Sequence, residues 1–343
     1  NYKDSVASQV SYIPFDYKHH RWAKPSDWKW QIAPITPNQL PELVKPGDLI
    51  GHIQPNAAQS TGLPEGLPVI AAGADKASEV LGSGCLQPHQ ACLSYGTTAT
   101  INVTSDKYIE PVRFIPPYPS SIADSYTLEF QIHRGYWMVS WFKEEFAHAE
   151  KLLSEKLGVA TEQVLEESVS DIPPGSDGLM LQPYWSPGVK VPGPEARGAI
   201  IGFKDSHSKA HVYHAILEGI AYGLREGLEN IEHKTHQKIE QLYVSGGGSQ
   251  SSTSMQLTAD IFNRTAIRPH TYETSALGAA INAAVGIGIY NTYADASDAM
   301  CRQGKAFEPI PENAKIYQKL YQETYKRLYK QLKPLYKNLH NLN

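Results

Sequence analysis

Apolar residues recur along the chain with two periods, one typical of short strands and one typical of helices. The apolar run from Val69 to Ala72 predicts a buried strand, and Gly73 then permits a tight turn or a close approach to a ligand. From Lys76 onward the period is helical. Asp75 therefore stands where a strand ends and a helix begins. Open α/β sheets place their chemistry at such positions, although a carboxylate there also caps helices.

Longer segments with a helical period follow in the rest of the chain. They predict a helix over 137–157, ended by Gly158, and a strong helix over 211–231. The segment 274–287 also reads as a helix and is rich in alanine and glycine, which suits close packing against a neighbouring backbone or a flat ligand. His211 and His214 lie three residues apart on one of these helices, but no third ligand lies nearby, so a metal site is not expected.

The tail over 313–339 has a helical pattern with a tyrosine every four residues. Pro334 is expected to kink or end this helix. Tyrosines at this spacing predict a half-buried docking face, which would suit a homodimer contact. By contrast, the prolines between residues 106 and 133 predict an irregular excursion.

Two glycine-bearing turns stand out as candidate ligand sites. The first is the tip Gly96-Thr97-Thr98 of a predicted hairpin over 90–104, which offers N–H groups and hydroxyls to an anion, or is an ordinary turn. The second is the triple glycine at 246–248, between a predicted strand and a predicted helix from Thr253 to Phe262. Such a turn lets a nucleotide approach a helix N-terminus. No lysine follows it, so it is not a Walker A loop, and it lacks the dinucleotide-binding spacing.

Composition narrows the class of protein. The chain has 343 residues, 41% of them hydrophobic and 19% charged, and a formal net charge of −4. These values predict two soluble domains and no electrostatic footprint for nucleic acid. The cysteines show neither ligand spacing nor a pairing pattern, which favours a reducing cytoplasm, and no apolar run predicts a membrane span. The chain begins at Asn1, which suggests that a longer native N-terminus precedes it.

Three separated stretches together resemble the FGGY family of carbohydrate kinases, which includes glycerol kinase and xylulokinase. They are Gly73-Ala-Asp75-Lys-Ala, Leu93-Ser-Tyr-Gly-Thr-Thr98 and Val244-Ser-Gly-Gly-Gly-Ser-Gln-Ser251. Their order and intervals match the family, as do three shorter stretches, at 196–199, 217–222 and 274–280. Each motif is short, but the ordered set is specific and covers most of the chain.

The resemblance implies an α/β fold like that of actin, Hsp70 and hexokinase, a ribonuclease H-like ATPase fold with mixed sheets flanked by helices. It implies that residues 1–84 are the C-terminal remnant of a sugar-binding N-terminal domain. Residues 85–310 would form the ATP-binding C-terminal domain, and residues 311–343 a C-terminal helix. The family's opening Asp-x-Gly-Thr phosphate loop has no match, so the chain alone is expected to be incomplete as an enzyme.

The resemblance also implies a reaction, ATP- and Mg²⁺-dependent phosphorylation of a sugar or polyol hydroxyl. Asp75 would be the general base and would also bind substrate with Lys76, and no protein-bound metal site is implied. The residues implied to bind ATP are Gly96, Thr97, Thr98, Gly135, Ser140, Gly247, Gly248 and Ser251. The sequence does not name the sugar.

Two other interpretations remain open at this point. The chain could be an actin-like switch that uses ATP without phosphorylating a sugar, or a nucleotide-binding regulatory fragment that needs a partner carrying the absent domain. A dinucleotide-dependent dehydrogenase is disfavoured, because the glycine spacing and the downstream acid are wrong.

Overall fold

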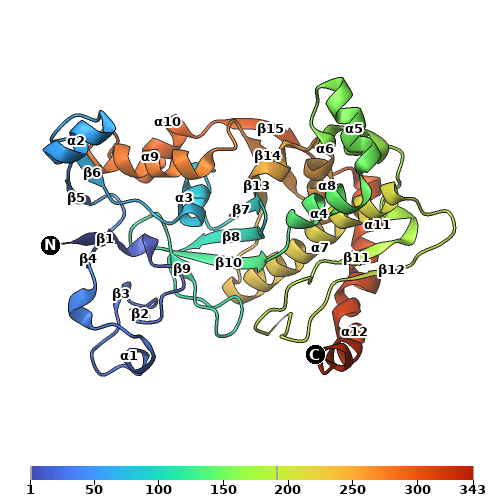
Figure 1. The fold of residues 1–343 in the computed structure, drawn as a ribbon, viewed down its shortest axis with the longest axis horizontal. Coiled ribbons are helices and arrows are strands. Elements are labelled where there is room, and N and C mark those ends of the chain that lie inside the picture. Colours follow the sequence, from blue (N-terminus) through green and yellow to red (C-terminus); the bar gives the residue numbers. More distant parts are fainter. Residues whose placement is uncertain (1, 191, 343) are drawn as a thin grey trace. The chain divides into compact units, whose positions relative to one another are not determined.

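The computed structural model describes residues 2–190 and 192–342 (Figure 1). The chain divides into two compact units. Unit 1 comprises residues up to 92, residues 102–129 and residues 269–303. Unit 2 comprises residues 93–101, 130–268 and the residues from 304 onward. Both units contain strands and helices, so the α/β class predicted from the sequence is confirmed, and each unit is described by itself below. The predicted domain boundaries at residues 84 and 310 stay predictions.

Short strands and short helices make up the N-terminal part of unit 1. The strands form parallel and antiparallel pairs: β1 (Lys3–Ser5) with β4 (Glu42–Val44), β2 (Phe15–Asp16) with β3 (Arg21–Trp22), and β5 (Leu49–His52) with β6 (Pro68–Ile70). The first helices are α1 (Lys29–Ile32) and α2 (Pro55–Thr61). The prediction of a buried strand at Val69–Ala72 is wrong in part. Among the described residues β6 pairs only with β5, and Val69 keeps 36% of its surface exposed.

Helices α3 (Asp75–Gly82) and α9 (Thr274–Gly286) of unit 1 pack with their backbones in close contact. A Cβ on Gly82 would lie 1.9 Å from the carbonyl oxygen of Thr274, and one on Gly278 would lie 1.9 Å from that of Ser78. The small residues of α9 therefore serve helix packing against a backbone, one of the two uses that the sequence allowed. Helix α10 (Tyr293–Met300) packs beside α9.

A seven-stranded sheet runs in the order β15-β14-β13-β7-β8-β10-β9. Its strands are β7 (Gln90–Tyr95), β8 (Ala99–Ser105), β9 (Tyr118–Pro119), β10 (Tyr126–Ile132), β13 (Gln241–Ser245), β14 (Thr265–Pro269) and β15 (Gln303–Phe307). The sheet is mixed, since β13 and β14 are parallel while β9 and β10 are antiparallel. The hairpin predicted over 90–104 is present as β7 and β8. The irregular excursion predicted over 106–133 is wrong for β10, because all of its prolines precede that strand.

Unit 2 is built around one long helix, α7 (Lys209–Thr235), which packs against α4, α8 and β11 (Figure 1). Its other elements are α4 (Trp137–Phe146), α5 (His148–Leu157), α6 (Thr161–Ser168), β11 (Met180–Gln182), β12 (Ala199–Ile201) and α8 (Ser252–Phe262). Glycines four residues apart on α7 permit this packing. A Cβ on Gly219 would lie 2.7 Å from Leu181, and one on Gly227 would lie 2.2 Å from the ring of Phe130.

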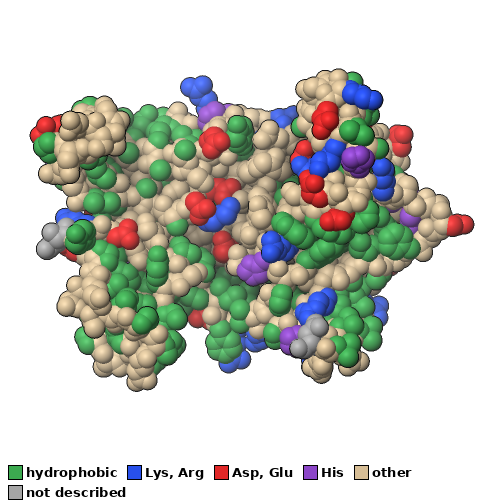
Figure 2. Space-filling model, viewed as in Figure 1, with side chains coloured by type: hydrophobic (Ala, Val, Ile, Leu, Met, Phe, Trp, Pro, Cys, Tyr) green, Lys and Arg blue, Asp and Glu red, His purple; other side chains and the backbone are tan. Residues whose placement is uncertain are grey.

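The helix predicted over 137–157 is two helices, because Ala147 leaves the helical conformation between α4 and α5. Charged side chains gather at the surface over this region (Figure 2). Ion pairs there join Lys151 to Glu144 at 2.6 Å and, from α7 to α5, Lys209 to Glu150 at 2.6 Å. Exposed pairs of this kind contribute about 0–1 kcal/mol each, so they orient the short helices more than they stabilise them.

The middle of α7 carries a buried polar cluster. The Glu218 carboxylate accepts hydrogen bonds of 2.7 Å from the backbone N–H of Gly175 and from the hydroxyls of Ser176 and Tyr317. Burial raises the pKa of Glu218 to about 7, although these donors oppose the shift. His214 Nδ1 lies 2.9 Å from the Ser176 hydroxyl, and burial lowers its pKa to about 4. His214 therefore belongs to a structural cluster.

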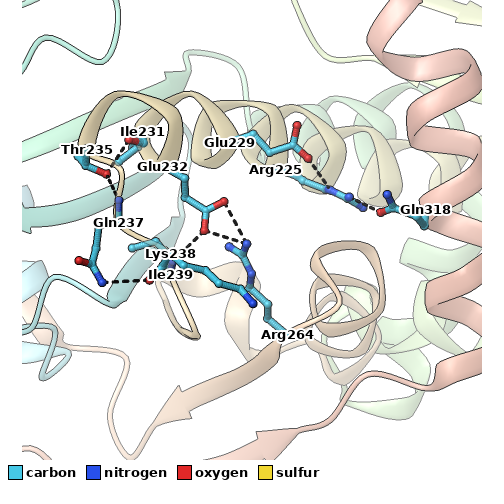
Figure 3. A network of polar contacts seen from close by, with 10 residues as sticks. All are labelled: Arg225, Glu229, Ile231, Glu232, Thr235, Gln237, Lys238, Ile239, Arg264 and Gln318. Atoms are coloured by element: carbon cyan, nitrogen blue, oxygen red, sulfur yellow. Dashed lines mark hydrogen bonds and ion pairs between the residues drawn. The ribbon is translucent and has the colours of Figure 1, made fainter.

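The C-terminal end of α7 is fastened by a second polar network (Figure 3). Glu232 accepts hydrogen bonds from Arg264, at 2.9 and 3.1 Å, and from the backbone N–H of Ile239 at 2.7 Å. Two turns earlier, Arg225 contacts Glu229 and Gln318. These contacts hold the start of β13, and with it the glycine turn that follows, against the long helix.

The tail consists of α11 (Pro311–Leu320), a π-helical turn (Tyr321–Tyr325) and α12 (Lys326–His340). Tyr317, Tyr321 and Tyr325 are buried, and the ring of Tyr222 on α7 stacks on Tyr325 with centroids 5.0 Å apart. The wider π-turn keeps tyrosines four residues apart on one face. The predicted docking face is thus largely covered by α7 of the same unit. Pro334 lies inside α12 and does not end it, so that half of the prediction is wrong, while a kink at Pro334 stays a prediction.

None of Cys85, Cys92 and Cys301 takes part in a disulfide. Within residues 2–190 and 192–342, no helix combines the length and the apolar character that crossing a membrane requires.

Candidate functional site

A pocket of about 530 Å³ in unit 2 brings together most of the predicted ATP-binding residues. It lies where the β7–β8 tip, α4, α6 and the start of α8 meet. Six predicted residues line it: Gly96, Thr97, Ser140, Gly247, Gly248 and Ser251. Residues far apart in the sequence, from 96 to 251, thus share one cavity within a single unit.

The β7–β8 tip is fixed to the start of α4 by backbone hydrogen bonds. The N–H of Tyr136 donates to the Gly96 carbonyl at 3.0 Å, and that of Trp137 to the Thr97 carbonyl at 3.4 Å. The predicted residues Thr98 and Gly135 support this arrangement and do not line the pocket. Thr98 Oγ1 donates to the His133 carbonyl at 3.1 Å, and a Cβ on Gly135 would lie 2.4 Å from the Ala99 nitrogen.

The second glycine turn approaches the same pocket and leads into α8. Gly246 has φ +80°, a conformation that favours glycine, and a Cβ there would lie 3.0 Å from the Tyr95 backbone. A Cβ on Gly248 would lie 2.4 Å from the Tyr136 ring, whereas one on Gly247 would meet nothing within 4 Å. Ser251 caps α8, its Oγ accepting the Ser254 N–H at 3.0 Å. This turn therefore presents backbone, not side chains, to the pocket.

Helix α6 supplies one part of the pocket wall, and none of its residues was predicted from the sequence. Glu162, Gln163 and Glu166 line the cavity from this helix. Burial raises the pKa of Glu166, while the Ser251 hydroxyl and the Thr253 N–H stabilise its charged form. Glu162 and Glu166 are four residues apart, so they share a helix face, but this spacing alone does not connect 161–168 with the glycine turns.

Asp75 and Lys76, the predicted catalytic and substrate-binding residues, belong to unit 1. Asp75 is the first residue of α3 and is exposed, while Ala74 occupies the N-cap position. The Asp75 Oδ1 atom accepts the Lys76 N–H at 2.7 Å, so some capping character remains. On the next turn, the buried Glu79 pairs with Lys76 Nζ at 2.7 Å. Burial would lower the pKa of Lys76, but the Glu79 carboxylate outweighs it and raises that pKa.

A further carboxyl group shares the electrostatic surroundings of Asp75, and the sequence analysis did not select it. Glu129 lies on β10, between the buried side chains of Leu128 and Phe130. Burial raises the pKa of Glu129 to about 7; Lys76 opposes the shift, and Asp75 adds to it. The sequence predicted an irregular segment here and not the strand β10. Glu129 was not selected, because its position depends on that strand.

Across residues 2–190 and 192–342, no group of three or more His, Cys, Asp or Glu side chains is arranged to hold a metal ion. Mg²⁺ in phosphoryl-transfer sites needs only one or two carboxylates, since phosphate oxygens and water complete its shell. The exposed carboxylate of Asp75 is compatible with such a shared role.

Family models match both parts of the chain. The C-terminal domain of the FGGY family of carbohydrate kinases matches residues 91–287, and its N-terminal domain matches residues 11–82. An uncharacterized sugar kinase, YgcE of Escherichia coli, is 35% identical over 92% of this chain and 64% of its own length. The xylulose kinase of Bacillus subtilis is 32% identical over 83% of this chain, and the gluconokinase of that species is 28% identical over 85%.

Solved structures agree with the sequence matches. The xylulose kinase from Rhodospirillum rubrum superposes with a TM-score of 0.74, at 28% identity over 88% of this chain and 59% of its own. The ligand-bound xylulose kinase from Lactobacillus acidophilus gives a TM-score of 0.84 at 21% identity, over 98% of this chain and 66% of its own. The chain spans 55–64% of the length of the three curated relatives named above.

Proposed function

Since this chain belongs to the FGGY family of carbohydrate kinases, we propose that it transfers the γ-phosphate of ATP to a hydroxyl of a sugar or polyol. The observation that supports this most is the pocket of unit 2, where two glycine turns meet the start of α8. The backbone N–H groups and hydroxyls of the β7–β8 tip suit a polyphosphate, and the second glycine turn lets the rest of a nucleotide approach closely. Because the chain spans less than two thirds of its curated relatives, activity is proposed for the protein expressed at the full length of its gene.

We assign the nucleotide to the residues that line this pocket. Gly96 and Thr97 would hold the β- and γ-phosphates through backbone N–H groups and a hydroxyl. Gly247, Gly248 and Ser251 would lie against the rest of the nucleotide, and Ser140 would close the wall from α4. Thr98 and Gly135 act indirectly in this proposal, by fixing the tip and letting α4 approach it.

Asp75 would act as the general base. In this step the substrate oxygen forms a bond to the γ-phosphorus, the bond from that phosphorus to the β–γ bridging oxygen breaks, and ADP leaves. The hydroxyl proton passes to the Asp75 carboxylate. Phosphoryl transfer depends mainly on positioning and charge neutralisation, so a single base is sufficient. Lys76, held by Glu79, would face the substrate as a fixed positive charge.

Mg²⁺ bound with ATP would neutralise the phosphate charge, and Asp75 is the exposed carboxylate proposed to contact its shell. The name of the acceptor stays open, because relatives are named for xylulose and gluconate alike.

A panel of pentuloses, hexuloses, sugar acids, glycerol and other polyols, each with MgATP and the full-length protein, tests this function. We expect ADP release to depend on one class of acceptor and to yield its phosphate ester. ADP release that no acceptor stimulates would contradict the proposal and favour the actin-like switch.

A further inference from the structure

The pocket of unit 2 has an asymmetric charge. Among its described lining residues, the only charged ones are Glu162 and Glu166, both on α6, and neither lysine nor arginine lines it. We infer that Glu166 binds the hydroxyls of the nucleotide's ribose and thereby makes the site selective for ribonucleotides over 2′-deoxyribonucleotides. This inference rests on the proposed function, because it takes a nucleotide as the occupant of the pocket.

The charges set the direction in which a nucleotide can enter. A triphosphate would be repelled by carboxylates on α6, so its phosphates must lie at the uncharged end, where the Gly96–Thr97 tip offers N–H and hydroxyl donors. The nucleoside then extends toward α6 and the start of α8. A carboxylate accepts hydrogen bonds and never donates them, so it suits hydroxyl groups at this end.

Glu166 is better placed for this role than Glu162. Glu162 is already paired with Lys143 of α4, at 2.5 Å. Glu166 interacts instead with the Ser251 hydroxyl and the Thr253 N–H at the start of α8. An ionised carboxyl group has about four acceptor positions, so two neutral donors hold it in place and leave positions for two adjacent hydroxyls.

The surroundings of Glu166 keep it available as an acceptor. Its pKa is raised by burial, but Arg268 and the two donors on α8 favour the charged form, while Glu162 opposes it. Ribose hydroxyls donate stronger hydrogen bonds to the ionised carboxylate than to the neutral carboxyl group. Binding of the ribose and ionisation of Glu166 should therefore reinforce each other.

The test is calorimetric binding of ATP and 2′-deoxy-ATP to the wild-type protein, to Glu166→Gln and to Glu167→Gln. Glu167 is the matched control, because it is the exposed neighbour on the same helix and does not line the pocket. Wild type and Glu167→Gln are expected to bind ATP about tenfold more tightly than 2′-deoxy-ATP, a typical value for a hydrogen bond to a charged group. Glu166→Gln should lose most of this preference, with little change for 2′-deoxy-ATP.

Three results would overturn the inference. Equal affinity of the wild type for ATP and 2′-deoxy-ATP would do so without any variant. An equal loss for both nucleotides in Glu166→Gln would show that Glu166 only supports the start of α8. If Glu166→Gln weakened the binding of ATP but not that of ITP, which lacks the adenine amino group, the carboxylate would contact the base and not the ribose. If no nucleotide binds at all, the proposed function fails too, whereas binding without selectivity removes only this inference.

Discussion

The predicted site residues of unit 1 and those of unit 2 present different chemical groups. In unit 1, the residues around Asp75 carry charge, with Lys76 and Glu79 paired at 2.7 Å and a further carboxyl on Glu129. In unit 2, the pocket presents glycine backbone and hydroxyls, and its acids stand only on α6. Backbone N–H groups and hydroxyls suit the phosphates of the proposed nucleotide. Side-chain chemistry suits the step that transfers the phosphate.

The largest expected effect is a loss of turnover when Asp75 of unit 1 is replaced. Asp75→Asn removes the proposed base but keeps its size, and general-base catalysis is worth about 10²–10⁴-fold in rate. We expect kcat of the full-length protein to fall by that factor while ATP binding, measured by calorimetry, is kept. Asp205→Asn, an exposed change in unit 2, is the control. Near-normal turnover in Asp75→Asn would rule out the base assignment.

The packing of α3, the helix that begins at Asp75, depends on Gly278 of α9. Gly278→Ala would place a Cβ 1.9 Å from the Ser78 carbonyl oxygen and force α9 away from α3. Overpacking of this kind costs about 1–3 kcal/mol, which urea unfolding would measure. Gly51→Ala serves as the comparison, because a Cβ there meets nothing within 4 Å. Equal stability of the two variants would show that the helices can separate at no cost.

A smaller effect, on ATP binding, is expected at the glycine turn of unit 2. A Cβ on Gly247 would meet nothing within 4 Å, so Gly247→Val should hardly change the melting temperature. If the nucleotide lies against this turn, the added side chain should weaken ATP binding by about tenfold, a change of about 1.4 kcal/mol. Unchanged affinity would mean that ATP does not approach Gly247.

The smallest effect concerns the buried polar cluster in the middle of α7. Glu218, with a pKa raised to about 7, favours folding at low pH, and that contribution fades as pH rises through 7. His214, with a pKa lowered to about 4, favours folding at high pH and loses its contribution as pH falls. Between pH 4.5 and 6.5 the two slopes oppose each other.

Glu218→Gln should leave only the slope of His214, so the free energy of unfolding should rise with pH across that window. Urea titrations at several pH values measure it. A variant whose stability does not vary with pH would contradict the opposed ionisations.

The glycine turns that line the pocket could be selected from the sequence, whereas the acidic side chains of the pocket could not. Glycines at fixed positions mark turns directly, so Gly96, Gly247 and Gly248 could be selected, and they share one pocket. Glu166 and Glu129 could not be selected, because each depends on an element whose position is set by tertiary packing. Local signals also failed to predict the break at Ala147 and the continuation of α12 past Pro334.

The most direct test of the account is a crystal structure of the full-length protein with a non-hydrolysable ATP analogue and its sugar. The account predicts the γ-phosphate at the Gly96–Thr97 tip, the ribose beside Glu166, and Asp75 within hydrogen-bonding distance of the acceptor hydroxyl. Phosphates lying at the α6 end, or an acceptor hydroxyl that faces a different base, would contradict it.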